Sequence, residues 1–375
     1  MAYGSFMEIP FSPEEKHRYA RHFSLPEIGP EGQAKLKRAR ILIIGAGGLG
    51  SPSALYLAAA GIGTIGLVDA DTVDLSNLQR QVLYTTSDLG RAKTEVAQEK
   101  LALLNPNIRM IAHAERLTAV NAEKIIAYYD CVIDGSDNFA THYLVNDACV
   151  IVRKPFVYGA VQGFNGEAGA VMPVKSACYR CLYPVAPPVD AAPDCSMAGV
   201  LGVVPGLIGM IAATEALKLI LGIGETLAGR ALRFDALKMK FCEIAVARDE
   251  NCVVCGKNPS IRRLAAEAYE GHDCAMETEI TAAELKQELK GKSAPFLLDV
   301  RNPPEFAIGY IEGAKLIPLP VLAERLGELD PAADIVVYCA HGIRGGKAAN
   351  LLREKGFSRI RNLTGGIAAF DPRFN

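Results

Sequence analysis

Four cysteines in the middle of this 375-residue chain form two pairs of the type Cys-x-x-Cys. The first motif contains Cys178 and Cys181, and the second contains Cys252 and Cys255. Both motifs lie in segments rich in turn-forming residues. Four thiolates can surround a metal ion tetrahedrally and leave no open coordination position, which is typical of a structural zinc site. The pairs therefore predict one Zn²⁺ bound by these four residues, with four unrelated core cysteines as the alternative. Cys195 lies between the two pairs in the sequence. Such a site would therefore also hold Cys195 near the molecule that the domain binds.

A cysteine near the C-terminus has a different setting. A strand predicted at 333–340 ends at Cys339, and a loop of the form Cys-x-x-x-x-Arg runs to Arg344, where a helical pattern begins. The N–H groups of such a loop and the helix N-terminus favour the thiolate. Four intervening residues make the loop tighter than the Cys-x5-Arg loop of phosphatases, so that it suits a single sulfur atom. The pattern predicts a cysteine that carries a persulfide; a small buried cysteine at a strand end is the alternative.

A glycine-rich turn lies near the N-terminus. The apolar run RILII (40–44) is followed by GAGGLG (45–50) and then by a helical pattern. In this context glycines let the backbone approach a phosphate, and the helix N-terminus supplies free N–H groups. Asp69, near the end of a second predicted strand (64–71), suits ribose hydroxyls. Taken alone, these features also fit a nicotinamide-dependent dehydrogenase.

Charged residues further along the chain favour a nucleoside triphosphate. Arg80 and Lys93 suit its phosphates, and Asp137, in the turn after a buried strand, suits Mg²⁺. Hydride transfer needs no such set, although Arg80 and Lys93 could also be solvated surface charges. We therefore predict an ATP site, with the dehydrogenase and a non-catalytic ATP-binding scaffold as alternatives.

The elements that position these residues indicate an α/β protein of two domains. We expect a Rossmann-like ATP-binding domain with a mainly parallel sheet and the zinc site over 1–256, a linker over 257–279, and a small α/β domain over 280–375. The latter opens with a predicted helix whose N-cap is Thr281. The apolar stretch 200–223 is interrupted by glycine, proline and charged residues, so we expect a buried helix and no membrane contact.

Composition adds two expectations. The net charge of −2 gives no indication of nucleic-acid binding. Ten cysteines without a recognisable signal peptide indicate the reducing cytoplasm.

Taken together, the motifs of residues 12–256 resemble the bacterial relatives of ubiquitin-activating enzymes. The motifs are GAGGLG, the segment from Asp69 to Gln81, GRAK, DGSDN and the two cysteine pairs. The family members most similar are the molybdopterin-synthase and thiamine-pathway adenylyltransferases. These enzymes adenylate the C-terminal glycine of small β-grasp sulfur-carrier proteins. The resemblance implies ATP, Mg²⁺ and Zn²⁺ as cofactors, a carrier protein as partner, and molybdenum cofactor biosynthesis as one compatible pathway.

The resemblance also implies a role for individual residues. Asp137 resembles the family's magnesium-binding aspartate, and Arg21 an arginine that completes the ATP site of the neighbouring subunit in a homodimer. Cys195 resembles a mobile-loop cysteine that forms covalent intermediates in some members. The other residues resemble the family's ATP contacts: Gly48, Asp69, Ser76, Asn77, Leu78, Gln79, Arg80, Lys93 and Asn138.

Residues 280–372 resemble a rhodanese domain. The segment DVRNPPEFAIGYIEGAKLIPL (299–319) is similar to the family's signature, with Tyr310 where histidine is common, and NLTGGIAAF (362–370) is similar to its closing segment. The resemblance implies that Cys339 takes sulfur from a persulfide or thiosulfate donor. Its terminal sulfur would then attack the acyl-adenylate, and the product would be a C-terminal thiocarboxylate.

Overall fold

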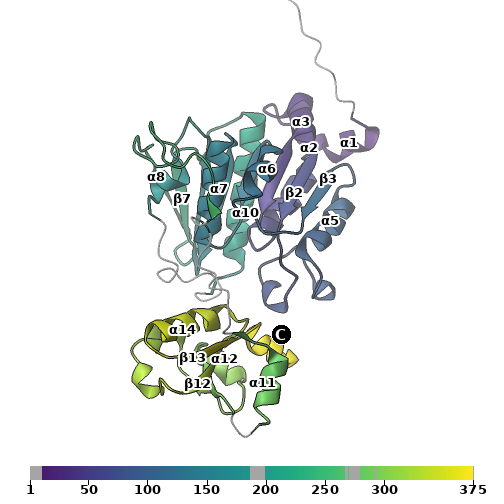
Figure 1. Cartoon of the computed structure of the whole chain (residues 1–375). Helices are drawn as coiled ribbons and strands as arrows, with labels where there is room; N and C mark the ends of the chain where they lie inside the picture. The colour runs from purple at the N-terminus through teal and green to yellow at the C-terminus, as the bar shows by residue number, and fades with distance from the viewer. Residues whose placement is uncertain (1–10, 186–198, 267–268, 270–278, 292–293, 375) are drawn as a thin grey trace, which may run out of the picture. The chain divides into compact units, whose positions relative to one another are not determined.

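The computed structural model describes residues 11–185, 199–266, 269, 279–291 and 294–374. Cys195 therefore lies outside the described residues. The chain divides into two compact units, Met1–Gly271 and His272–Asn375, which are coloured from purple to green and from green to yellow in Figure 1. Each unit is described by itself below.

The first unit is built on an eight-stranded sheet in the order β3-β2-β1-β4-β5-β6-β7-β8. The strands from β3 to β5 pair in parallel, and β6, β7 and β8 continue the sheet antiparallel. The mainly parallel sheet expected from the sequence is confirmed for the strands from β3 to β5. The strands are β1 (Arg40–Ile44), β2 (Thr64–Val68), β3 (Arg109–His113), β4 (Cys131–Asp134), β5 (Phe156–Gln162), β6 (Asn165–Val171), β7 (Arg230–Asp235) and β8 (Lys240–Ala245).

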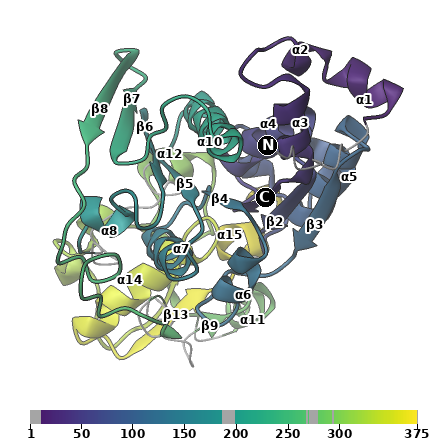
Figure 2. The same ribbon diagram turned by 90° about the horizontal axis from the view of Figure 1, so that it is seen from above.

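Helices cover both faces of this sheet, as Figure 2 shows. Side chains alternate along β1, so that Ile41 and Ile43 join the core under α4 and α10, while Leu42 and Ile44 join the core under α6 and α7. The helices are α1 (Pro13–Arg18), α2 (Ala20–Phe23), α3 (Gly29–Arg38), α4 (Gly50–Ala60), α5 (Lys93–Leu104), α6 (Ala122–Ala127), α7 (Phe139–Ile151), α8 (Tyr179–Leu182) and α10 (Val203–Leu221), with 3-10 turns η1 (Leu75–Asn77) and η2 (Thr86–Asp88).

Helix α10 is the one helix among the described residues that is long and apolar enough to cross a membrane. It packs against α4 and against strands β4, β5 and β6. Its buried Glu215 accepts the Leu227 N–H at 2.7 Å and pairs with Lys218 at 2.5 Å. The core helix of a globular domain has the same length and composition, so this single helix is weak evidence for a membrane span.

Part of the expected linker packs onto the first unit. Ile261 and Leu264 contact the core beside α7, and Tyr269 is buried there. The Tyr269 hydroxyl donates a hydrogen bond of 2.7 Å to Asp147 on α7. The scattered apolar residues that follow Cys255 thus extend the first unit beyond residue 256.

The second unit contains a five-stranded parallel sheet in the order β11-β10-β12-β13-β9. The central strand β12 has Ile335 and Val337 in the core on one face and Val336 and Tyr338 on the other. The strands are β9 (Glu279–Ile280), β10 (Phe296–Asp299), β11 (Lys315–Leu316), β12 (Asp334–Tyr338) and β13 (Arg359–Leu363). The helices are α11 (Ala282–Glu288), α12 (Pro303–Ile308), α13 (Leu319–Leu322), α14 (Ile343–Glu354) and α15 (Gly366–Phe370), with 3-10 turns η4 (Leu326–Glu328) and η5 (Pro372–Phe374).

Candidate functional site

Three loops with predicted site residues meet at one edge of the first sheet. In the parallel register, Ile44 at the end of β1 lies opposite Val68 of β2 and Asp134 of β4. The chain runs from β1 to one side of the sheet through β2 and β3 and returns to the other side as β4. Such a reversal opens a crevice at the carboxyl ends of the strands, where α/β proteins bind nucleotides.

The glycine-rich loop fits tightly between its neighbours. Gly45 has a φ of +85°, and a Cβ atom there would lie 2.8 Å from the carbonyl oxygen of Gly135. The Ala46 carbonyl accepts a 3.0 Å hydrogen bond from Tyr84, and the Ala46 N–H donates to Asp69 at 2.8 Å. Gly48 lies beside Arg80, with 3.4 Å between a Cβ built at Gly48 and Arg80 Cγ. The loop is therefore fixed by hydrogen bonds on both sides of Ala46, and position 45 admits only glycine.

Asp69 directly follows β2, and Lys93 is the first residue of α5. Asp69 accepts the N–H groups of Ala46 and Asp71, both at 2.8 Å. Burial raises the pKa of Asp69. Lys93 is only 4% exposed, and its Nζ donates to the exposed Asp71 at 2.9 Å. A buried cation that faces an exposed carboxylate can exchange that partner for a phosphate.

The segment Ser76, Asn77, Leu78, Gln79 and Arg80 begins in turn η1. Asp74 caps this turn by accepting the Ser76 N–H at 2.8 Å. Arg80 turns back on the segment, and its Nη1 donates to the Ser76 carbonyl at 3.1 Å. The segment thus stands as a compact turn beside the glycine-rich loop.

Asp137 and Asn138 connect β4 to α7. Asp137 is exposed, and Asn138 caps α7 by accepting the Thr141 N–H at 2.9 Å. Directly before them, Asp134 is fully buried and accepts hydrogen bonds from Ser136 and His142. Sequence reasoning missed His142; the one available signal was an aspartate that ends an otherwise apolar strand.

The four paired cysteines lie together. Their sulfur atoms are all within 4.8 Å of one another. The sulfur–sulfur distances are 3.9 Å from Cys178 to Cys181, 3.6 Å from Cys178 to Cys252 and 3.4 Å from Cys181 to Cys255. With zinc–sulfur bonds of about 2.3 Å, tetrahedral geometry places sulfurs about 3.8 Å apart. The Asp249 N–H also donates to the Cys181 sulfur at 3.4 Å. The donor set fits Zn²⁺.

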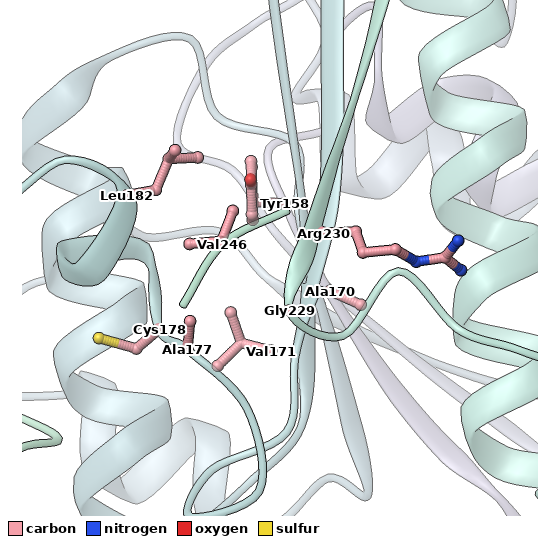
Figure 3. Close-up of a pocket in the computed structure, with 9 residues that line it drawn as sticks. All are labelled: Tyr158, Ala170, Val171, Ala177, Cys178, Leu182, Gly229, Arg230 and Val246. Carbon is pink, nitrogen blue, oxygen red and sulfur yellow. The ribbon is translucent and has the colours of Figure 1, made fainter. Parts of the chain in front are cut away.

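The cavity beside this cluster is too small to bind a substrate. It has a volume of about 10 Å³ and is lined by Cys178, Tyr158, Arg230 and mostly small or apolar residues. Figure 3 shows these side chains. The space is about that of one water molecule. No substrate can therefore reach the cysteine cluster through this cavity, which is compatible with a structural metal site.

Cys339 lies directly after β12 and is 2% exposed. The Gly342 N–H donates to its sulfur at 3.2 Å, and Gly342 has a φ of +92°, a conformation that favours glycine. The N–H of Ile367, in α15, donates to the Cys339 carbonyl at 2.8 Å. The loop therefore holds the sulfur at the N-terminus of α14, where N–H groups stabilise a thiolate.

Arg344 has a partner that the sequence analysis did not identify. Its two terminal nitrogens donate to the two carboxylate oxygens of Glu305 at 2.7 and 2.6 Å. Burial by itself would lower the pKa of Arg344, but Glu305 and Cys339 reverse the effect and raise it. Glu305 belongs to α12, so the arginine connects the Cys339 loop to that helix.

One other predicted residue, Arg21, is not joined to these sites in the described part of the chain. Arg21 is exposed on α2, which packs against α3. Cys195 lies in the segment that the structure leaves undescribed.

Comparison with known proteins gives the same division of the chain. Residues 19–254 match the ThiF family, and residues 281–372 match the rhodanese-like domain. The probable adenylyltransferase/sulfurtransferase MoeZ of Mycobacterium tuberculosis is 42% identical over 96% of this chain and 93% of its own length. The sulfur carrier protein adenylyltransferase of Thermus thermophilus is 49% identical over 68% of this chain and 96% of its own.

Further relatives extend these similarities. Adenylyltransferase and sulfurtransferase MOCS3-2 of Zea mays is 39% identical over 96% of this chain and 80% of its own. The crystal structure of E. coli MccB with MccA-N7isoASN superposes with a TM-score of 0.59 at 26% identity, covering 67% of this chain and 77% of that one. These matches favour neither a dehydrogenase nor a non-catalytic scaffold. The chain belongs to the ThiF family, as an adenylyltransferase joined to a rhodanese-like sulfurtransferase domain.

Proposed function

We propose that this enzyme uses ATP to adenylate the C-terminal glycine of a small β-grasp sulfur-carrier protein and then converts it into a thiocarboxylate. The observation that carries the proposal is that one chain combines a nucleotide crevice of the ThiF family with a loop that presents Cys339 to the Gly342 N–H. The first domain suits activation of a carboxylate, and the second suits delivery of sulfur.

Adenylation requires charge neutralisation more than a nucleophile. The carrier's carboxylate attacks the α-phosphorus of ATP, which forms the acyl-adenylate and releases pyrophosphate. Lys93 would leave Asp71 for the phosphates, and Arg80 would join it from the turn beside Gly48. Asp137 would hold Mg²⁺, which neutralises phosphate charge when bound. Asp69 would accept the ribose hydroxyls.

Sulfur transfer follows in two steps and ends with the reduction of a disulfide. The terminal sulfur of a Cys339 persulfide attacks the acyl carbon, so that AMP leaves and an acyl disulfide with Cys339 forms. A thiolate then attacks the Cys339 sulfur and releases the thiocarboxylate, which leaves a disulfide on Cys339. A dithiol reductant returns that disulfide to the thiol. We propose Cys195 as the attacking thiolate because the sequence places it between the two cysteine pairs.

We propose a homodimer with one structural Zn²⁺ per subunit, active in the cytoplasm. An open hollow of about 420 Å³ lies between α2, α4 and α10, and apolar side chains such as Tyr56, Met210 and Leu217 line it together with His22. A second copy would cover this apolar surface. Arg21, next to His22, would then lie at the interface, where an arginine can reach the neighbouring ATP site.

ATP–pyrophosphate exchange tests the first half of the proposal. Exchange should require ATP, Mg²⁺ and a carrier protein that ends in glycine. Candidate carriers from the molybdopterin, thiamine, cysteine, siderophore and transfer-RNA thiolation pathways should be compared side by side. Exchange without any carrier, or with none of them, would contradict the proposal.

A further inference from the structure

A closed hydrogen-bond cluster lies under the turn that carries Asp137. Asp134 ends β4 with no exposed surface. It accepts the Ser136 N–H at 3.1 Å, the Ser136 hydroxyl at 2.6 Å and the His142 Nδ1 at 2.7 Å. Ser136 lies in the turn, and His142 lies in the first two turns of α7. The carboxylate therefore holds the turn to both its strand and its helix.

The Asp134–His142 hydrogen bond favours the charged form of both groups. Burial by itself would lower the pKa of His142, but the Asp134 carboxylate reverses this and raises it. Burial would likewise raise the pKa of Asp134, and His142 instead lowers it. Both groups are nearly inaccessible to solvent, with 4% exposure for His142. A charged donor and a charged acceptor make a stronger and more directional hydrogen bond than neutral groups.

The segment that follows Cys178 packs against His142. The ring of Tyr179, the residue after Cys178, lies 5.6 Å from the His142 ring at an angle of 36°. The Tyr179 N–H donates to Asn146, one turn further along α7, at 2.8 Å. His142 thus lies between the buried carboxylate and the short helix α8, which follows Cys178.

We propose that His142 is a positioning residue for adenylation, which orients the Asp134–Asn138 turn so that Asp137 faces the nucleotide's magnesium ion. His142 touches neither substrate nor metal and acts through Asp134. The inference rests on the proposed function, in which Asp137 is the magnesium ligand. It predicts that loss of the Asp134–His142 hydrogen bond weakens divalent-metal binding more than it weakens the fold.

Two variants of His142 separate positioning from packing. His142→Leu fills the space but removes the hydrogen bond, whereas His142→Asn places an amide N–H near the position of Nδ1. In His142→Leu the Mg²⁺ concentration for half-maximal exchange should rise about tenfold or more, because a hydrogen bond between charged groups is lost. His142→Asn should recover most of that loss.

Metal binding can be measured without turnover. Mn²⁺ serves as a spectroscopic probe for Mg²⁺, and its affinity in the presence of a non-hydrolysable ATP analogue is read by electron paramagnetic resonance. The same order should appear, with His142→Leu weakest and His142→Asn close to the unmodified protein. Ser136→Ala, which removes another donor to Asp134, should shift the affinity in the same direction by a smaller factor and is available if His142→Leu does not fold.

A second histidine provides the matched control. His113, on β3, is partly buried and hydrogen-bonds to Tyr129 at 2.9 Å through Nε2. His113→Leu and His113→Asn should leave the metal dependence unchanged. Unchanged metal affinity in His142→Leu and Ser136→Ala, or equal impairment of both His142 variants, would overturn the inference. Normal exchange by Asp137→Ala would instead overturn the magnesium assignment on which the proposed function rests.

Discussion

The ion pair between Glu305 and Arg344 should stabilise the second unit. Removing it should therefore lower the free energy of unfolding of that unit. Arg344 is 7% exposed, and both its terminal nitrogens bind Glu305. Replacement of Glu305 by alanine leaves the guanidinium buried without its carboxylate. Breaking a buried ion pair costs about 3–5 kcal/mol. Because the Glu305 side chain is 32% exposed, water can enter the gap, and we expect a loss of about 2–3 kcal/mol.

Differential scanning calorimetry of the full chain measures this loss. For a domain of about 100 residues, each kcal/mol corresponds to roughly 4–8 °C in Tm, so the transition of the second unit should fall by about 8–24 °C. Sulfur transfer from thiosulfate should weaken, while ATP–pyrophosphate exchange should persist because Glu305 belongs to the other unit. Glu324→Ala, at an exposed glutamate of the same unit, should change stability by less than about 0.5 kcal/mol.

The pH dependence gives an independent check. Burial alone would raise the pKa of Glu305, but the hydrogen bonds from Arg344 outweigh it and lower the pKa. A depressed pKa contributes stability above the unfolded value, and this contribution is lost as the pH falls through the folded value. The stability difference between the unmodified chain and Glu305→Gln should therefore shrink on acidification. A difference that does not shrink as the pH falls from neutral through the unfolded and the folded pKa, or a loss under about 1 kcal/mol in Glu305→Ala at neutral pH, would refute the reasoning.

Three further predictions concern the other sites. Cys339→Ala should keep carrier-dependent pyrophosphate exchange and lose thiocarboxylate formation, and mass spectrometry should find the extra sulfur of donor-treated protein on the Cys339 peptide; sulfur on another cysteine would contradict this division. Cys181→Ala should lower the zinc content from one ion per chain toward none and reduce the Tm of the first unit, as measured by metal analysis and calorimetry; retention of zinc would exclude this ligand set. Mixed Arg21→Ala and Asp137→Ala chains should regain part of the exchange activity through hybrid dimers, and no recovery after proven subunit exchange would exclude an arginine in trans.

Local patterns in the sequence predicted the elements that depend on near neighbours. The glycine turn, the strand ending at Cys339 and the Thr281 cap each follow from residues a few positions apart. Thr281 is the N-cap of α11 as predicted, and it accepts the Glu284 N–H at 3.3 Å in a capping box. Glycine at position 45 is required by the approach of Gly135. Such features are readable from sequence because the backbone geometry of a turn or cap is set within one or two turns of chain.

Partner choice over long separations was decided by the tertiary structure. Glu305 and Arg344 are 39 residues apart, and Tyr269 and Asp147 are 122 residues apart. The sequence contains many carboxylates, arginines and tyrosines, and local patterns do not show which of them form pairs. Only packing of α12 beside the Cys339 loop, and of the segment after Cys255 onto α7, selects these pairs. A buried charge must find an opposite partner, but which partner it finds depends on the elements that exclude water from both.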